Sequence, residues 1–266
     1  MTKNFLSALF LLAFCSVASA GAIEVITLTD ITGERDTALL IGATEAQLKK
    51  FVPSGKLQNQ IAAFLVKFEG QEILFDAGLR DGHVVNELVK NGAAPEKIKF
   101  VVLTHLHGDH FGGLVTPEGK AAFPEAEIFI AKPEKIFWAD EKKNEGVLEA
   151  LSLYEGRVKL FDFGDEILPG VKAIDTTGHT PGHTSFLIES SGEKFLILGD
   201  IIHFVDIQLP VPEVAVTYDT DPVKAVQSRK FILDYAAQKE IPVAGMHIKG
   251  SGILKIKKSG EGYENF

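Results

Sequence analysis

Cysteine is nearly absent from this sequence, because Cys15 is the only one in 266 residues. It lies in an N-terminal stretch with the pattern of a cleaved signal. The rest of the chain can therefore form no disulfide, and it offers neither a thiolate nucleophile nor a cysteine metal ligand. The sequence also contains no Gly-x-Ser-x-Gly nucleophile elbow. Any metal site must be built from His, Asp and Glu.

Residues 1–20 have the features of a secretory signal peptide. Lys3 gives a positive start, residues 5–14 are an apolar run, and an A-x-A cleavage pattern ends at Ala20. The apolar run is too short to span a bilayer as an anchor. We therefore expect cleavage near Ala20 and export, to a bacterial periplasm or beyond. Residues 21–266 would then carry no membrane anchor.

Basic residues are outnumbered by acidic ones. The chain has 27 Lys and Arg against 36 Asp and Glu, a net charge of −9. The signal holds one lysine and no acid, so its removal takes the net charge to −10. Nucleic acids and anionic lipids both reward excess Lys and Arg, so neither is expected as a partner. We expect a small-molecule substrate instead.

Residues 21–266 contain no repeat, low-complexity tract or long linker, which predicts a single domain. Alternating and continuous apolar runs predict strands at 23–28, 61–68, 72–75, 100–103, 127–131, 158–161, 171–175, 185–189, 194–198 and 243–246. Helical spacing and end signals predict helices at 44–51, 83–91, 133–140, 145–154 and 222–239. Strands predominate in each half and helices flank them, which predicts an α/β sandwich of packed sheets with helices outside.

The densest group of chemistry-bearing side chains is Thr-His-Leu-His-Gly-Asp-His over residues 104–110, directly after the apolar run 100–103. Imidazole and carboxylate groups suit zinc and similar divalent ions. A loop at the end of a buried strand can aim them at one point. The motif therefore predicts a metal site with four candidate ligands, which are His105, His107, Asp109 and His110.

Three later apolar strands also end in metal-capable residues. One leads to the segment 178–184, which contains His179 and His183, and the others lead to Asp200 and His247. A single buried His or Asp is more often a hydrogen-bonded core residue. Four such strand ends in one chain favour a shared site, presented by rigid strands.

This order of residues resembles the metallo-β-lactamase superfamily over residues 23–250: His105-x-His107-x-Asp109-His110, then His179, Asp200 and His247. The resemblance implies a four-layer αββα sandwich. Within the superfamily, the secreted methyl parathion hydrolase group and the related N-acyl-homoserine lactonases are most similar. The segments that carry this likeness are 122–124, 137–138, 178–184 and 198–200.

The resemblance implies two divalent metal ions, most simply Zn²⁺. One ion would be held by His105, His107 and His179, and the other by Asp109, His110 and His247, with Asp200 between them. His183 would support the site or pack in the core. Asp76, in an Asp-x-Gly motif after the strand 72–75, would orient a ligand or stabilise a turn.

A pair of ions about 3.5–4 Å apart can share a water and leave hydroxide at neutral pH, which attacks the substrate. Asp109 would also accept a proton from that water. His203, where the related lactonases carry tyrosine, is a candidate donor to a carbonyl or leaving group. The alternative is a half-buried histidine on a strand. Four aromatic residues are candidates for either a pocket wall or the core: Phe111, Phe137, Trp138 and Phe204.

The leading hypothesis is a secreted hydrolase with a dinuclear zinc site that acts on a small ester, lactone or phosphotriester. Amide hydrolysis of the β-lactamase type is the neighbouring alternative. An iron-dependent oxidoreductase similar to persulfide dioxygenases, which share much of the motif, is an alternative of another class. A non-catalytic zinc-binding protein is a third. A homodimer is expected by family likeness alone.

Overall fold

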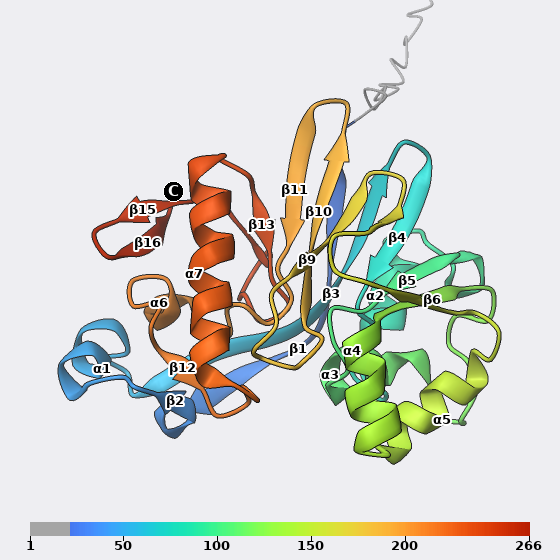
Figure 1. Cartoon of the computed structure of the whole chain (residues 1–266), viewed down its shortest axis with the longest axis horizontal. Helices are drawn as coiled ribbons and strands as arrows, with labels where there is room; N and C mark the ends of the chain where they lie inside the picture. The colour runs from blue at the N-terminus through green and yellow to red at the C-terminus, as the bar shows by residue number, and fades with distance from the viewer. Residues whose placement is uncertain (1–21) are drawn as a thin grey trace, which may run out of the picture.

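The computed structural model describes residues 22–266, so the predicted signal over residues 1–20 lies outside the described part. Two six-stranded sheets lie against each other in the centre of this part, and helices cover their outer faces (Figure 1). The first sheet has the order β1-β3-β4-β5-β6-β7 and the second the order β14-β13-β11-β10-β9-β8. This helix–sheet–sheet–helix layering confirms the predicted αββα sandwich.

The strands of the first sheet are β1 (Glu24–Asp36), β3 (Lys56–Phe68), β4 (Gln71–Phe75), β5 (Phe100–Val102), β6 (Glu127–Ala131) and β7 (Val158–Phe161). Those of the second are β8 (Glu166–Leu168), β9 (Val171–Asp175), β10 (Thr184–Ser190), β11 (Glu193–Ile197), β13 (Val243–Ala244) and β14 (Ile253–Leu254). Two small sheets pair β2 (Leu40–Ile41) with β12 (Ala215–Val216), and β15 (Ile256–Ser259) with β16 (Gly262–Asn265).

The helices are α1 (Glu45–Phe51), α2 (Val84–Lys90), α3 (Gly108–Phe111), α4 (Lys132–Lys135), α5 (Glu145–Leu153), α6 (Val205–Gln208) and α7 (Pro222–Gln238). Short 3-10 turns lie at Thr37–Leu39, Pro95–Lys97 and Gly112–Leu114. Most predicted elements end within one or two residues of the observed ones. The elements that the sequence missed have two to four residues, which is too short to produce a periodic pattern.

Strand β3 is buried on both faces, which explains its continuous apolar run. Alternate residues of a strand point to opposite faces. Phe64 and Val66 therefore join the core between the two sheets, where Phe186 of the second sheet also packs. Ala63 and Leu65 face the other way, into the core between the first sheet and its helices. One strand thus supports two cores.

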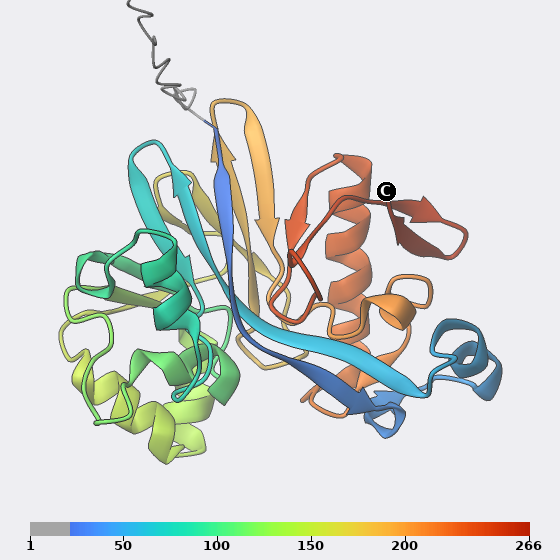
Figure 2. The ribbon, with the colours of Figure 1, turned by 180° about the vertical axis from the view of Figure 1, so that it is seen from behind.

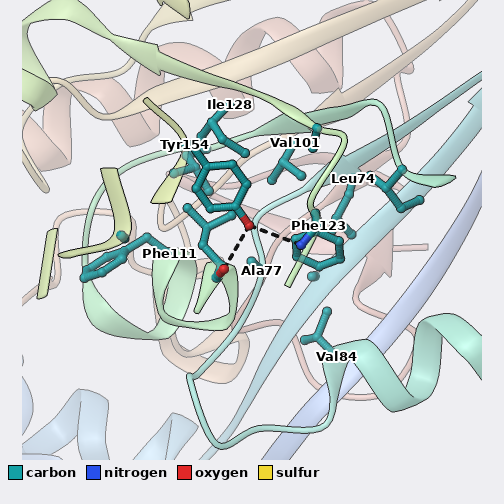
Figure 3. Packing of buried hydrophobic residues seen from close by; sticks show 14 of the residues in the cluster. Leu74, Ala77, Val84, Val101, Phe111, Phe123, Ile128 and Tyr154 are labelled. Carbon is teal, nitrogen blue, oxygen red and sulfur yellow. Dashed lines mark hydrogen bonds between the residues drawn. The ribbon is translucent and has the colours of Figure 1, made fainter. Parts of the chain in front are cut away.

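The hydroxyl of Tyr154 is buried in the core between the first sheet and its helices (Figure 3). This hydroxyl donates to the carbonyl oxygen of Leu114 at 2.8 Å and accepts from the backbone N–H of Phe123 at 3.2 Å. Burying a hydroxyl without partners would cost about 1–3 kcal/mol. Because both hydrogen bonds are made, the Tyr154 hydroxyl avoids this cost and links the end of α5 to the turn that follows α3.

Helix α7 covers the outer face of the second sheet (Figure 1). Asp221 caps its first turn by accepting from the backbone N–H of Lys224, and Pro222 occupies the first helical position. Ile232 and Leu233 are buried in the core beneath the helix. The predicted helix over residues 222–239 is confirmed to within one residue.

Arg229 of α7 is buried and donates hydrogen bonds to backbone carbonyls. Its guanidinium contacts the carbonyl oxygens of Ile201 at 2.6 Å, Pro212 at 3.0 Å and Val214 at 2.8 Å. These contacts hold the segment 201–214 against the helix. The segment matters for the site, because it carries one of the histidines singled out by the sequence.

The outer halves of β1 and β3 leave the sheet as a two-stranded arm that reaches α1 (Figure 2). The predictions of strands at 23–28 and 61–68 were therefore too short. The outer residues are mostly exposed and polar, so they lack the alternation that indicates a buried strand. A β-bulge at Asp30 marks the bend, and this buried carboxylate accepts from the backbone N–H groups of Leu79, at 2.7 Å, and His83.

The prediction of one helix over residues 133–140 was only partly right. After α4 the chain widens into a π-helix over Ile136–Glu141, with a bond from the N–H of Lys142 to the carbonyl of Phe137 at 2.9 Å. Sequence periodicity does not distinguish this wider turn from an α-helix, and π-helical turns often lie at functional sites. Within residues 22–266, no helix is long and apolar enough to cross a membrane.

Candidate metal centre

The candidate ligands come together because their strands run in the same direction. In the second sheet β9, β11 and β13 are mutually parallel, so the loops that follow them meet at one edge. These loops carry His179, Asp200 and His247. The loop after β5 of the first sheet brings the 104–110 motif to the same place. The structure thus gathers seven predicted residues into one cluster: His105, His107, Asp109, His110, His179, Asp200 and His247.

Three histidines and one carboxylate form the first group of possible ligands. The Nδ1 atom of His107 lies 3.0 Å from the Nε2 atoms of both His105 and His179. The Oδ2 atom of Asp200 lies 3.1 Å from the His179 Nε2 atom and 3.6 Å from that of His105. All four ligand atoms lie within 4.8 Å of one another. Three nitrogens and one oxygen are a typical zinc donor set.

Asp109, His110 and His247 form the second group. The carboxylate of Asp109 lies 3.7 Å from the Nε2 atom of His110 and 3.5 Å from that of His247. Asp200 lies between the two groups, with Oδ1 3.2 Å from His110 Nε2 and Oδ2 3.2 Å from His247 Nε2. The arrangement has the form of two adjacent sites that share Asp200.

The far sides of these rings are held by acceptors from elsewhere in the fold. The Nδ1 atom of His179 lies 2.9 Å from the carboxylate of Asp219, and that of His247 lies 2.7 Å from the carbonyl oxygen of Gln60. Both partners can only accept, so each Nδ1 carries the proton. The Nε2 atoms therefore face the centre, as in many metal sites.

Asp76 orients two more rings. Its Oδ2 atom lies 2.7 Å from Nδ1 of His110 and accepts from the hydroxyl of Thr104 at 2.8 Å. The same hydroxyl oxygen lies 3.0 Å from Nδ1 of His105. One buried carboxylate therefore orients His110 directly and His105 through Thr104. Of the two roles left open for Asp76, the structure supports that of a ligand-orienting residue.

The charges at the centre favour a bound cation. Burial, together with the nearby His179, lowers the pKa of His107 to about 3, so this ring is neutral. Burial also acts to lower the pKa of His179, but hydrogen bonds to Asp200 and Asp219 raise it to about 9, and carboxylates likewise raise the pKa of His110 and His247. Burial acts to raise the pKa of Asp200, but His110, His247 and other neighbouring histidines hold it well below its ordinary value. Metal binding requires neutral imidazoles and an ionised carboxylate, so divalent ions bound here would displace protons from His110, His179 and His247.

Two buried atoms at the centre lack hydrogen-bond partners among residues 22–266: Nε2 of His110 and Oδ1 of Asp200. They lie 3.2 Å apart without the geometry of a hydrogen bond. An unsatisfied buried polar atom costs about 1–3 kcal/mol, and more when the group is charged. A cation at this position would satisfy both. The residues therefore fit the two metal ions that the sequence implied.

His183 lies beside the centre but is fully engaged by backbone. Its Nε2 atom accepts from the N–H of Asp200 at 2.9 Å, and its Nδ1 atom lies 3.0 Å from the carbonyl oxygen of Thr176. Neither ring nitrogen is free to bind a metal. This matches the expectation that His183 supports the site, which it does by fixing the backbone of Asp200.

His203 lies directly against Asp200, in the turn that precedes α6 and not on a strand. Its Nε2 atom is 3.2 Å from Oδ2 of Asp200, and its ring stacks on that of His247 with centroids 4.9 Å apart. Neither ring nitrogen has a hydrogen-bond partner in the described chain. Burial lowers the pKa of His203 to about 4, although Asp200 opposes this. The neutral ring carries one N–H, and its catalytic role stays a prediction.

A cavity of about 800 Å³ opens onto the centre. Its walls come from the β1–β3 arm, from the loop over residues 79–82 and from the segment around His203. The lining includes Ile31, Arg35, Ile61, Leu79, Phe204, Tyr218 and the exposed sides of His107 and Asp109. Of the four aromatic candidates, Phe204 lines the cavity. Phe111 packs in the core, and neither Phe137 nor Trp138 is among the lining residues.

Three groups that support the ligands were not predicted from the sequence. They are Asp219, the carbonyl of Gln60, and Glu134, which accepts hydrogen bonds from the loops that carry His105 and His179. Asp219 lies 40 residues from His179, and Gln60 lies 187 residues from His247. No local pattern links such distant residues. A carboxylate or a carbonyl near a metal-binding histidine can be expected in general, but its position in the chain cannot.

Comparison with known proteins supports the same interpretation. Residues 58–240 match the family described as the metallo-beta-lactamase superfamily. An N-acyl homoserine lactonase from Bacillus cereus is 28% identical over 173 residues, which cover 55% of this chain and 65% of that relative. Another, from Bacillus sp., is 33% identical over 110 residues, which cover 41% and 40%. The chain thus spans less than two thirds of either relative.

Two solved structures match nearly the whole chain, each with a TM-score of 0.84. The hydrolase AbOPH of the beta lactamase superfamily is 30% identical, with 92% of this chain and 94% of that chain covered. AidC, a dizinc quorum-quenching lactonase in complex with a product, is 27% identical, with 93% and 95% covered. The His and Asp cluster and this dizinc relative together suggest two metal ions. The chain, which resembles hydrolases throughout, belongs to the metallo-beta-lactamase superfamily.

Proposed function

We propose that this protein is a zinc-dependent hydrolase with two metal ions that cleaves small lactones or related esters. The observation that carries the proposal is the convergence of seven ligand-type side chains beside a cavity of about 800 Å³. The similarity to N-acyl homoserine lactonases and to a dizinc lactonase favours lactones within the broader class. Phosphotriesters and other esters stay in the proposal, because the same centre accepts several electrophiles.

The His and Asp cluster would hold the ions in the two groups described above. When bound, two zinc ions would lower the pKa of a water shared between them and polarise the substrate carbonyl. Asp109 faces the cavity with its side chain 27% exposed. Burial acts to raise its pKa, but His110 and His247 lower it below the ordinary value, so it is ionised. It can therefore accept the proton of the attacking water.

The cavity suits a substrate with an apolar group beside its reactive bond. Its lining includes the apolar side chains of Ile31 and Ile61 on the arm, together with Leu79 and Phe204. AidC was solved with N-hexanoyl-L-homoserine, which has an acyl chain and a carboxylate. By analogy, the apolar walls would take the acyl chain of a lactone and keep water away from it.

His203 is proposed to donate its N–H to the carbonyl or leaving-group oxygen of the substrate. It lines the cavity next to Asp200, and its ring nitrogens have no hydrogen-bond partner within residues 22–266. His203→Phe should lower kcat about 10–100-fold, because a hydrogen bond to a charged oxygen contributes about 1.5–3 kcal/mol. His203→Gln should recover part of the loss. Both variants should keep the zinc content of the parent, measured by elemental analysis.

Two outcomes would contradict this role of His203. An unchanged kcat in His203→Phe would show that the side chain does not act in the reaction. Loss of zinc in both variants would instead make His203 a metal ligand, which its proximity to Asp200 and His247 also permits. The two roles are therefore separated by one pair of measurements.

The proposed function is tested by a substrate panel on the purified protein with its metals quantified. The panel contains acyl-homoserine lactones, aryl esters, paraoxon-type triesters and cephalosporins. Hydrolysis of a lactone or ester with about two zinc ions per chain is expected. Preferential cephalosporin hydrolysis would favour the amide hydrolase. Bound iron with thiol-dependent oxygen uptake would contradict the hydrolase proposal. Zinc binding without turnover of any substrate would indicate a non-catalytic zinc-binding protein.

Export from the cytoplasm is also part of the proposal. It rests on the charge, apolar run and A-x-A pattern of residues 1–20. Sequencing the N-terminus of the protein from a periplasmic fraction tests it, since a first residue near Gly21 is expected and retention of Met1 would contradict it. The homodimer stays a prediction from family likeness.

A further inference from the structure

Glu134, in α4, is a fully buried carboxylate that has no Lys, Arg or His partner among residues 22–266. It accepts four hydrogen bonds. Its Oε1 atom accepts from the backbone N–H of Leu106 at 2.8 Å and from the indole N–H of Trp138 at 2.7 Å. Its Oε2 atom accepts from the hydroxyl of Thr180 at 2.7 Å and from the backbone N–H of Gly182 at 2.8 Å. Every partner is a donor, which suits an ionised carboxylate.

Three of the four donors belong to loops that carry candidate ligands, and the fourth, Trp138, lies in the π-helix after α4. Leu106 lies between His105 and His107, whereas Thr180 and Gly182 lie one and three residues after His179. Each oxygen of Glu134 therefore holds a different loop. A side chain at position 182 would collide with the backbone of Glu134, so glycine is needed for this close approach. The carboxylate fixes the separation of two loops that must converge on one ion.

Trp138 extends this support to His107. The indole ring, held by its bond to Glu134, packs edge-on against the imidazole of His107 with centroids 5.4 Å apart and planes at 71°. The hydrogen bonds of the His107 ring are to His105 and His179, both within the centre. Unlike His110 and His179, the His107 ring has no hydrogen bond to a carboxylate in the described part of the chain. The Trp138 ring is thus the feature that orients His107 from outside the centre.

The second group of ligands has no such connection to Glu134. Asp76 holds His110 and the carbonyl of Gln60 holds His247, and within residues 22–266 neither group is bonded to Glu134. Asp76 also accepts from Thr104 and so supports the loop of His105, but it does so independently of Glu134. We propose that Glu134 is a positioning residue that fixes the His105, His107 and His179 group for metal binding and leaves the Asp109, His110 and His247 group largely untouched. This inference deepens the proposed function and rests on its two-metal centre.

Zinc titration of the purified full-length protein tests the inference. Glu134→Gln keeps the shape of the side chain but replaces one acceptor oxygen with an NH₂ group, which would face a donor. We expect one of the two zinc sites to weaken about 10–100-fold, as is typical when a residue that orients ligands is changed. The other site should keep the affinity of the parent protein. Competition with a chromophoric chelator measures both.

Ligand variants identify which site is affected. His179→Ala removes a ligand of the first group and His247→Ala a ligand of the second, and the Glu134→Gln titration should resemble that of His179→Ala. Absorption of the cobalt-substituted proteins gives an independent signature of each site. Glu141→Gln, an identical change at an exposed position in the adjacent π-helix, is the matched control and should leave both affinities unchanged.

Two milder variants keep the test decisive if Glu134→Gln does not fold. Thr180→Val and Trp138→Phe each remove a single donor, and each should weaken the same zinc site by a smaller factor. Equal weakening of both sites, or no change in a folded variant, would overturn the inference. If the parent protein bound fewer than two ions, the proposed centre itself would fail. The two failures are therefore distinguishable.

Discussion

Replacing Asp200 with Ala is expected to lower kcat/KM at least about a thousandfold and to reduce the zinc content below two ions per chain. The two oxygens of this carboxylate face both ligand groups, with 3.1 Å to His179 and 3.2 Å to His110. Metal-ion catalysis supplies several kcal/mol of transition-state stabilisation, and each 1.36 kcal/mol corresponds to a factor of ten in rate. Steady-state kinetics and elemental analysis of the same sample provide the measurement.

Asp206→Ala is a suitable control, because Asp206 is an exposed carboxylate on the neighbouring helix α6. It should have the kinetics and the zinc content of the parent. Circular dichroism must show that the Asp200 variant is folded, since this carboxylate also balances the charge of buried histidines. A folded Asp200→Ala protein with normal turnover would overturn the assignment of the site.

Removing the metal is the second change with a large expected effect, and it should act on both activity and stability. The centre joins loops from both sheets, so ions bound there stabilise the folded chain and not the unfolded one. An ion present at 1,000 times its Kd contributes about 4 kcal/mol. For a chain of this size that corresponds to a fall in Tm of roughly 10 °C after chelation. Calorimetry before and after dialysis against a chelator measures the change.

Hydrolysis should disappear in the same chelated sample and return when Zn²⁺ is added back. Magnesium serves as the control ion, because it prefers six oxygen ligands and this centre is rich in imidazole. Full hydrolysis by protein shown to be metal-free would contradict the proposed chemistry. An unchanged Tm would show that the ions do not hold the loops together.

Local structure could be predicted where local interactions dominate. The helix predicted over residues 44–51 is observed at Glu45–Phe51, and Thr44 and Gln47 form a reciprocal capping box at its start. The strand over residues 127–131 has the expected bounds, because its apolar run is bounded by polar residues. In both cases the residues that determine the element are its own.

The predictions failed where a segment depends on distant partners. The arm formed by β1 and β3 has little hydrophobic alternation, and its outer strands are held by pairing with each other. The π-helix after α4 contains Trp138, which bonds to Glu134 and lies against His107. Neither feature has a sequence period that distinguishes it from the ordinary alternative.

The sequence by itself determined which side chains are available as ligands. The spacing in the 104–110 motif and the strand ends before His179, Asp200 and His247 identified all seven members of the cluster. This was possible because a metal site restricts ligands to a few residue types. The resemblance also predicted the superfamily and its fold, which the comparisons confirm.

Only the tertiary structure decided what each of these residues contacts. His179 and His183 lie in one motif, yet His179 faces the centre and His183 is bonded to the backbone of Asp200 and Thr176. The positions of Asp219 and Glu134 and the walls of the cavity were decided in the same way. The physical reason is that these contacts join residues tens to hundreds of positions apart, and packing of the two sheets, not any local pattern, brings them within hydrogen-bond distance.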